Sequence, residues 1–154
     1  MVVFSDALDT SNAIVFELEL LNRIADLERM SPWIEQCAET IGLSVRGTFR
    51  LQLLLEEVVM NIVDNAYDDE AEHSILVSLF AKNSGLVIQS EDDGRPFDPT
   101  EYPEVALPDR LDDAKAGGLG LHLVRSYADE YKYLRKDDKN ILTLKLRDSN
   151  DEAV

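Results

Sequence analysis

The sequence predicts an α+β domain, a two-layer α/β sandwich with helices on one face of a mixed, mostly antiparallel sheet. Strand-like and helical segments follow one another in the order strand, two helices, two strands, helix, two strands. Two of the strand pairs are joined by turns short enough for hairpins. With 154 residues, 45% of them hydrophobic, the chain can build one core. We therefore expect a single domain over 1–154, with its core at about 13–147.

The first part of the chain predicts a strand followed by a helix. Residues 13–20 pass from an apolar run into alternation, which is typical of a strand. Residues 22–41 have apolar residues at helical spacing, with a kink or restart at Pro32 and a stop at Gly42.

A second, longer helix is predicted from Thr48 to about Tyr67, a stretch without glycine or proline. Beside its apolar arc, Glu57, Asn61 and Asn65 form a polar row. Asparagine costs about 0.5 kcal/mol relative to alanine in a helix interior, so two of them one turn apart suggest a function. Amide oxygens suit a Mg²⁺ ion that bridges phosphates, and the neighbouring carboxylate can act as a base. A solvated polar edge is the alternative interpretation.

The second half of the chain predicts two hairpins with a helix between them. The turns lie at Lys82-Asn83-Ser84-Gly85 and Asp137-Asp138-Lys139. The predicted elements are strands at 74–82, 85–91, 131–136 and 140–147 and a helix at 119–130.

A long irregular segment separates the two hairpins. Between Phe97 and Gly117 there is little apolar periodicity, and four prolines fall between Pro96 and Pro108. Structureless loops longer than about 12–15 residues are uncommon in compact domains and often serve as lids. We expect a mobile lid at about 98–116, with a solvated loop as the alternative.

The segment that begins at Asp92 directly follows a predicted strand. A carboxylate only accepts hydrogen bonds, so Asp92 can bind the exocyclic amino group of adenine, whereas guanine presents a carbonyl there. ATP is therefore favoured over GTP. Gly94 permits close backbone approach or a positive φ, and Phe97 offers an apolar wall. Taken alone, Asp-Asp-Gly is also typical of an ordinary turn.

A glycine-rich stretch opens the predicted helix at 119–130. Free backbone N–H groups and the positive end of a helix dipole would form a phosphate site there. The stretch matches neither a dinucleotide fingerprint nor a P-loop, and a simple turn is the alternative. The nucleotide-binding residues predicted in this region are Lys115, Gly117, Gly118, Leu119, Gly120 and Leu121.

Charge and hydropathy exclude several partner classes. A net charge of −16 and a pI near 4.3 repel nucleic acid and anionic membrane surfaces. Any nucleotide must therefore arrive with a cation. The chain shows no signal pattern and no apolar run of about 20 residues, so we expect it in the cytoplasm. Its single cysteine, Cys37, is predicted to be a buried apolar residue.

Together and in this order, the three motifs resemble those of the Bergerat-fold (GHKL) ATPases, and specifically the bacterial anti-sigma factor serine/threonine kinases. The resemblance covers about 13–147. It implies that Glu57 is the general base, Asn61 the Mg²⁺ ligand and Asn65 a phosphate contact. It assigns adenine to Asp92, with support from Thr143 in the last strand. Two positions depart from the family pattern, namely Asn65 in place of a common histidine and Pro96 in place of a second glycine.

The resemblance implies a kinase that moves the γ-phosphoryl group of ATP to a serine or threonine of an anti-sigma-factor antagonist, and that alternately sequesters a sigma factor. Kinases of this kind often dimerise, so a homodimer is an open alternative. Two other functions stay open: an ATP-gated protein-binding module without phosphoryl transfer, and an acidic interaction domain without nucleotide. Glu57 favours the kinase, because binding alone requires no base.

Overall fold

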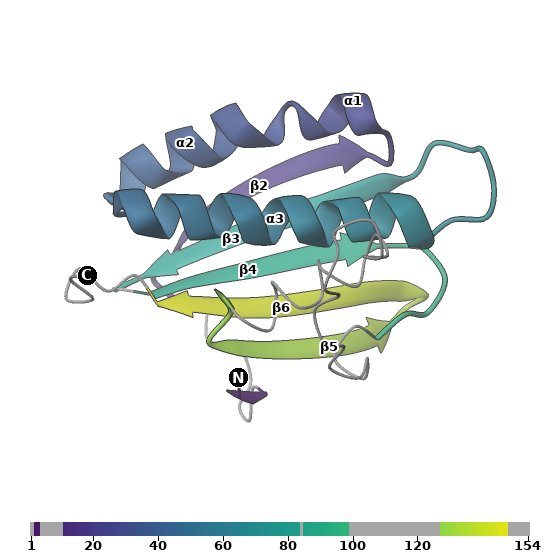
Figure 1. The fold of residues 1–154 in the computed structure, drawn as a ribbon. Coiled ribbons are helices and arrows are strands. Elements are labelled where there is room, and N and C mark those ends of the chain that lie inside the picture. The colour runs from purple at the N-terminus through teal and green to yellow at the C-terminus, as the bar shows by residue number, and fades with distance from the viewer. Residues whose placement is uncertain (1, 4–10, 84, 99–126, 148–154) are drawn as a thin grey trace, which may run out of the picture.

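The computed structural model describes residues 2–3, 11–83, 85–98 and 127–147. In these ranges the chain forms one sheet and three helices (Figure 1). The strands are β1 (Val2–Val3), β2 (Ile14–Leu21), β3 (Ser74–Lys82), β4 (Gly85–Asp92), β5 (Glu130–Lys136) and β6 (Lys139–Arg147). The helices are α1 (Ile24–Leu27), α2 (Met30–Ile41) and α3 (Val45–Asn65).

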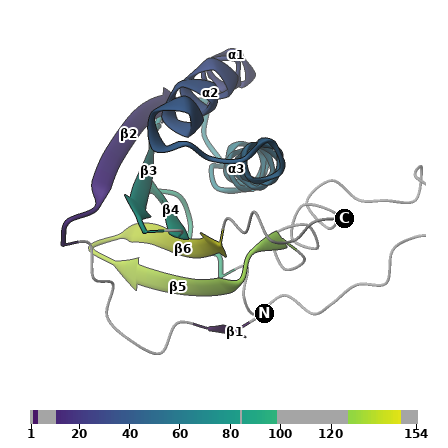
Figure 2. The same ribbon diagram turned by 90° about the vertical axis from the view of Figure 1, so that its left-hand side faces the viewer.

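The sheet has the strand order β1-β5-β6-β4-β3-β2. All neighbouring strands are antiparallel except β1, which pairs in parallel with β5. The three helices lie on one face of the sheet (Figure 2). This arrangement confirms the predicted two-layer α+β sandwich with a mixed, mostly antiparallel sheet. The two residues of β1 are too few to show a periodicity, and the sequence did not predict this strand.

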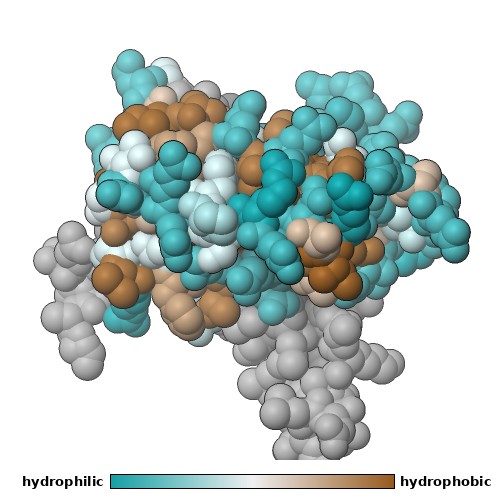
Figure 3. All heavy atoms as spheres, turned by 90° about the horizontal axis from the view of Figure 1, so that it is seen from above, coloured by the Kyte–Doolittle hydropathy of each residue, from teal (hydrophilic) through white to brown (hydrophobic). Residues whose placement is uncertain are grey.

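The core lies between α2 and α3 and the face of the sheet that they cover. Alternate residues of β4 point into it, and the last of these is Asp92, which is only 5% exposed. Outside the core, hydrophilic side chains interrupted by small apolar patches cover the outer surface of the helices (Figure 3). Helical and sheet residues of the core include Ile34, Cys37, Leu51, Leu55, Val59, Val77, Leu79, Ile88 and Leu144.

The helical region predicted at 22–41 is divided, but not at Pro32. The break lies at Glu28 and Arg29, between α1 and α2. Buried Asp26 stabilises this break, because its carboxylate accepts from Leu21 N (2.8 Å) and from the guanidinium of Arg29 (3.4 Å). Pro32 lies in the first turn of α2, where its missing N–H would have no helical partner. The predicted stop is confirmed, since Gly42 caps α2 with a left-handed φ of 69°.

Helix α3 begins at Val45, three residues before the predicted start at Thr48. Ser44 is its N-cap, and the hydroxyl of Ser44 accepts from Gly47 N at 2.9 Å. Gly47 is therefore part of the first turn, where a glycine interrupts few hydrogen bonds. The helix ends at Asn65, two residues before the predicted end. None of the described helices combines the length and the apolar character that crossing a bilayer requires.

Both predicted hairpins are present. Lys82 pairs with Gly85 to close the β3–β4 hairpin, and Asn83 has a left-handed φ of 55°. In the β5–β6 hairpin both central residues, Asp137 and Asp138, are left-handed, with φ values of 53° and 61°. Two successive left-handed residues are typical of a type I′ turn, whose twist matches that of the strands it joins.

Most predictions between the hairpins lie outside the described residues. They are the lid at 98–116, of which only residue 98 is described, and the helix at 119–130 up to residue 126. The predicted end of that helix at Glu130 is wrong. Tyr127 is helical, but Glu130 begins β5 and pairs with Lys145 of β6, whose ammonium lies 3.6 Å from its carboxylate.

The cap of α3 provides a test of its revised start. We expect Ser44→Ala to lower the free energy of unfolding by about 1 kcal/mol, because the first turn loses a side-chain acceptor. Ser44→Asp should retain most of the stability, since its carboxylate can accept the same hydrogen bond. Urea unfolding followed by circular dichroism measures both. Equal stability of Ser44→Ala and the unmodified protein would contradict the assigned cap.

Candidate functional site

The polar row of α3 borders the core as predicted. Glu57, Asn61 and Asn65 are all half-buried. The side-chain amide of Asn65 donates to Asn61 Oδ1 (2.9 Å) and to the backbone oxygen of Asn61 (3.1 Å). An amide oxygen has two lone pairs, so Asn61 Oδ1 keeps one for a further ligand. Asn65 therefore fixes the orientation of the Asn61 side chain.

Glu57 has an environment that suits a proton acceptor. Burial raises the pKa of its carboxyl, and the charge of neighbouring Glu56 raises it further. Within the described residues the side chain of Glu57 makes no hydrogen bond and no ion pair. A half-buried carboxylate without a protein partner, and with a pKa moved towards neutrality, can take up a proton from a bound group.

The side-chain oxygens of this row suit magnesium better than a metal ion that needs several protein ligands. In the described parts of the chain no three His, Cys, Asp or Glu side chains are grouped to hold an ion. Mg²⁺ is usually held by one or two protein oxygens together with waters and substrate phosphates. Asn61 Oδ1 is such an oxygen, because within the described residues one of its two lone pairs accepts no hydrogen bond. Asn61 is therefore the residue here that would hold the ion.

Asp92 lies at the end of β4, on the face of the sheet that the helices cover. Its Oδ1 accepts from Gly94 N at 2.9 Å and from the side-chain amide of Asn140 at 3.0 Å. Burial raises the pKa of the Asp92 carboxyl, and these two hydrogen bonds oppose the rise. Within the described residues both donors go to Oδ1. The other oxygen therefore remains an acceptor for a ligand.

Asn140, at the start of β6, organises the loop around Asp92. It lies opposite Asp92 in the β4–β6 pairing and is 7% exposed. Its amide also donates to the backbone oxygen of Arg95 at 2.9 Å. Its own oxygen accepts from the hydroxyl of Tyr133 (2.5 Å) and from Phe97 N (3.4 Å). One buried side chain thus holds the carboxylate and the loop that follows it.

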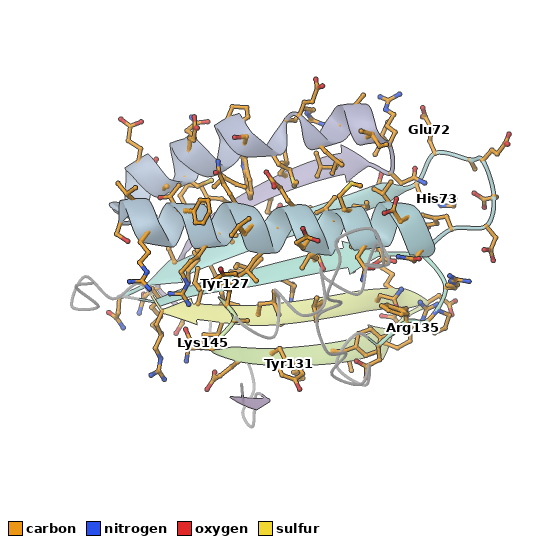
Figure 4. The ribbon with its side chains drawn as sticks, in the orientation of Figure 1. Glu72, His73, Tyr127, Tyr131, Arg135 and Lys145 are labelled. Atoms are coloured by element: carbon orange, nitrogen blue, oxygen red, sulfur yellow. The ribbon has the colours of Figure 1, made fainter. Side chains whose placement is uncertain are left out.

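A second strand residue holds the same loop. Arg135 of β5 lies beside the loop that follows β4 (Figure 4), and its guanidinium donates to the backbone oxygen of Gly94 at 2.7 Å. Phe97, the predicted apolar wall, is half-buried at the end of this loop. The β5–β6 hairpin therefore fixes the Asp92 loop from one side.

Helix α3 fixes the loop from the other side, through Gly94. Arg95 N donates to the backbone oxygen of Ala66, the C-cap of α3, at 2.9 Å. A Cβ atom on Gly94 would lie 2.5 Å from Ala66 Cβ and 2.7 Å from the Ala66 oxygen. Gly94 has no positive φ. Of the two predicted reasons for a glycine here, close backbone approach is therefore the correct one.

The role predicted for Thr143 is wrong. Thr143 pairs with Gln89, whose amide donates to its hydroxyl at 3.2 Å. Side chains alternate along a strand, so Thr143 and Asn140, three residues apart, point to opposite faces of the sheet. Thr143 therefore lies on the face of the sheet away from Asp92. The residue that supports Asp92 is Asn140 and not, as predicted, Thr143.

No sequence motif pointed to Asn140, Tyr133 or Arg135. Their importance depends on the pairing of β4 with β6, strands that are far apart along the chain. The glycine-rich part of the predicted site lies outside the described residues. It comprises Lys115, Gly117, Gly118, Leu119, Gly120 and Leu121.

Comparison with known sequences finds a family match over most of the chain. The family model of the histidine kinase-like ATPase domain matches residues 20–146. The serine/threonine-protein kinase BtrW of Bordetella bronchiseptica is 34% identical over 112 residues, which are 73% of this chain and 79% of BtrW. The serine-protein kinase RsbW of Halalkalibacterium halodurans is 25% identical over 109 residues, which are 68% of this chain and 65% of RsbW.

Solved structures share the fold. The structure of the RsbU and RsbW domains of Rv1364c from Mycobacterium tuberculosis matches 87% of this chain with a TM-score of 0.60 and 14% identity. This chain spans only 32% of that longer one. The blue-light activated histidine kinase of Erythrobacter litoralis EL346 matches 84% of this chain, and 43% of its own length, with a TM-score of 0.55 and 20% identity. At these identities the likeness concerns the fold alone.

The contrast between Asn140 and Thr143 can be measured. We expect Asn140→Ala to lower the free energy of unfolding by about 2–3 kcal/mol, because the Arg95 carbonyl and the Tyr133 hydroxyl lose their partner. Thr143→Val should cost less than about 1 kcal/mol, since half-buried Gln89 can turn its amide to water. Urea unfolding of both variants tests this, and equal losses would contradict the assignment of Asn140.

Proposed function

The chain belongs to the family of histidine kinase-like ATPase domains, and from this premise we propose that it binds ATP with Mg²⁺ and phosphorylates a partner protein on serine or threonine. One observation carries the proposal. The row of Glu57, Asn61 and Asn65 ends where Ala66 meets Gly94 of the Asp92 loop. The carboxylate that we propose binds adenine therefore lies beside the end of the helix that carries the proposed metal-binding row and base.

Asp92 reads the base. The internal donors from Gly94 and Asn140 both go to Oδ1, so the second carboxylate oxygen faces the ligand as a pure acceptor. The exocyclic amino group of adenine donates to such an acceptor, whereas the carbonyl of guanine at the same position would be repelled. This supports ATP as the nucleotide rather than GTP.

Asn61 would hold Mg²⁺ through its amide oxygen, with Asn65 orienting that amide. An ion held there would neutralise the phosphate charge, which a chain with a net charge of −16 would otherwise repel. The glycine-rich stretch at 117–121 and Lys115 stay the predicted contacts of the phosphates.

Glu57 accepts the proton of the attacking hydroxyl. The serine or threonine oxygen of the partner forms the new bond to the γ-phosphorus, the bond between that phosphorus and the leaving oxygen of ADP breaks, and the hydroxyl proton goes to the Glu57 carboxylate. The raised pKa of Glu57 suits this step. A module that only bound nucleotide would gain nothing from a half-buried carboxylate that pairs with no other described residue at this place.

The acceptor that we propose is a small anti-sigma-factor antagonist, with a sigma factor as the alternate partner. Support comes from the likeness to BtrW and RsbW, both of which are named as protein kinases that act on serine or on serine and threonine. The partners' identities and a homodimeric state stay predictions of that likeness.

Adenine recognition can be tested with Asp92→Asn. The amide oxygen of the variant must stay at the Oδ1 position to accept from Gly94 and Asn140, so its NH₂ group would meet the adenine amino group as donor against donor. We expect ATP affinity to fall by about 1.5–3 kcal/mol, the range for a lost hydrogen bond to a charged group. Isothermal titration calorimetry with Mg-ATP and Mg-GTP measures it.

Asp64→Asn is the matched control, because it makes the same charge change at an exposed position of α3. Its ATP affinity should stay unchanged. Equal affinities of the unmodified protein for ATP and GTP would remove the proposed role of Asp92.

Phosphoryl transfer can be tested with Glu57→Gln. The variant keeps the shape of the side chain but cannot take up the proton, so transfer should slow by about 10²–10⁴-fold while ATP affinity is retained. Single-turnover transfer to candidate antagonists, scored as phosphoserine and phosphothreonine, measures the rate.

Asn61→Ala is the contrasting variant, since losing the metal ligand should weaken ATP binding and transfer together. If Glu57→Gln transfers phosphate at the normal rate, the base is another group. If the unmodified protein binds ATP and its partner but never transfers phosphate, the ATP-gated binding module is the better account.

A further inference from the structure

A cluster of aromatic and acidic side chains connects the segment after α3 to the Asp92 loop. His73 belongs to the loop between α3 and β3, as Figure 4 shows. Its ring stacks on Tyr67, with ring centres 4.1 Å apart and planes inclined by 10°. Its Nε2 is 2.7 Å from Asp69 Oδ1, and its Nδ1 is 3.4 Å from Asp93 Oδ1. The functional site described above uses none of these four side chains.

Both ring nitrogens of His73 face a carboxylate. A neutral imidazole has one N–H group and can donate to only one of them, whereas the protonated ring donates to both. The geometry therefore matches the protonated form. In that form His73 bridges Asp69 of its own loop and Asp93 of the Asp92 loop.

Tyr67 adds a second link to Asp93, because its hydroxyl donates to Asp93 Oδ1 at 3.2 Å. Burial, together with the charges of Asp92 and Asp93, keeps the pKa of Tyr67 far above neutrality, so this donor stays protonated. The backbone of His73 is fixed independently, since its N–H donates to the side chain of Asn22 at 2.8 Å. Only the charge of the imidazole is left to vary.

Asp93 is the chain neighbour of Asp92 and precedes Gly94, so whatever holds Asp93 also holds the adenine-binding part of the loop. Asp93 itself is exposed and follows the last residue of β4. Within the described residues its side-chain partners are Tyr67 and His73, both from the segment that follows α3. Through these contacts His73 is connected to the part of the loop that we propose binds adenine.

We propose that His73 is a positioning residue of the nucleotide site, which in its protonated form holds Asp93 and thereby keeps the Asp92 loop in the binding arrangement. The proposal rests on the proposed function, since it requires that Asp92 bind a nucleotide. It adds a control by pH to the proposed nucleotide site.

The charges around His73 determine the direction of this control. The hydrogen bond with Asp69 raises the pKa of His73 above its ordinary value of 6.5, burial opposes the rise, and the charges of Asp69 and Asp93 add to it. In the described part of the chain two arginines near this loop pair with other carboxylates, Arg95 with Asp68 at 3.8 Å and Arg23 with Glu72 at 3.3 Å. Because the pKa is raised, the bridge is complete at low pH and is lost as the pH rises through the raised value.

The test is the affinity for Mg-ATP between pH 6 and pH 9. We expect the dissociation constant of the unmodified protein to increase about fivefold across the titration of His73, the lower end of the usual coupling between linked sites. His73→Gln cannot be charged and should bind with the weaker, high-pH affinity throughout. The titrations of ATP and of Asp92 affect both proteins equally. The difference between their two affinity curves therefore reports the titration of His73 alone.

Asp69→Asn provides a second variant that leaves Asp93 and the site untouched. It should keep the transition but move its midpoint to lower pH, because the charge that raises the pKa of His73 is lost. Reciprocity requires that ATP raise the proton affinity of His73 by the same factor, which the imidazole NMR signals measure. The chain has two histidines, and His73→Gln assigns the signal.

Superimposable pH profiles of the unmodified protein and His73→Gln would overturn this proposal and leave ATP binding intact. An unmoved midpoint in Asp69→Asn would overturn it as well. If the unmodified protein binds no ATP at any pH, the proposed function is overturned, and this proposal with it. The outcomes are therefore distinguishable.

Discussion

The contact between Ala66 and Gly94 is the constraint on which the site depends. Here the C-cap of α3 touches the loop after β4 so closely that a single Cβ atom on Gly94 would lie 2.5 Å from that of Ala66. Helix α3 and strand β4 both pack on the core, so neither can move to relieve an added atom. The polar row on the helix and the carboxylate at the end of the strand consequently have a fixed separation. Sites built on rigid elements keep their geometry in this way.

A network of satisfied polar groups makes this arrangement tolerable in a buried place. Burying a carboxylate or an amide without partners is costly, yet Asp92 and Asn140 are 5% and 7% exposed. Among the described residues no side-chain nitrogen or oxygen atom that is itself fully shielded from solvent lacks a hydrogen-bond partner. Asn140 uses both ends of its amide, and Asp92 uses one oxygen. The oxygen left over is the part of the network that a ligand can complete.

Much of the fold could be predicted because local patterns determine it. The passage from an apolar run into alternation predicted β2, and the two turn sequences predicted the β3–β4 and β5–β6 hairpins. The helix starts are predicted less well, because the pattern predicts a restart at Pro32 and a helix that begins only after Gly47. Both lie in a first turn, where backbone N–H groups have no helical partner, so a residue that breaks a helix elsewhere is tolerated there.

Of the candidate site, the local motifs could be predicted but not their support. Spacing along one helix places Glu57, Asn61 and Asn65 in a row without knowledge of the fold. Asn140 could not be found in this way, because its place opposite Asp92 depends on the register between β4 and β6, which a sequence motif does not encode. An odd offset of three residues along β6 is enough to move Thr143 to the other face of the sheet.

The charges near the Asp92 loop indicate how the proposed nucleotide site could work in an acidic protein. Near the Asp92 loop, Arg135 donates to the Gly94 carbonyl and Arg95 lies near Asp68, so in the described part of the chain both cations serve the loop itself. Adenine is neutral and is recognised by an acceptor, which an acidic protein can supply freely. The negative phosphates then need partners of another kind. In the proposed function, a metal ion held by the uncharged amide of Asn61 would supply positive potential, and so would the N–H groups of the helix start predicted at the glycine-rich stretch.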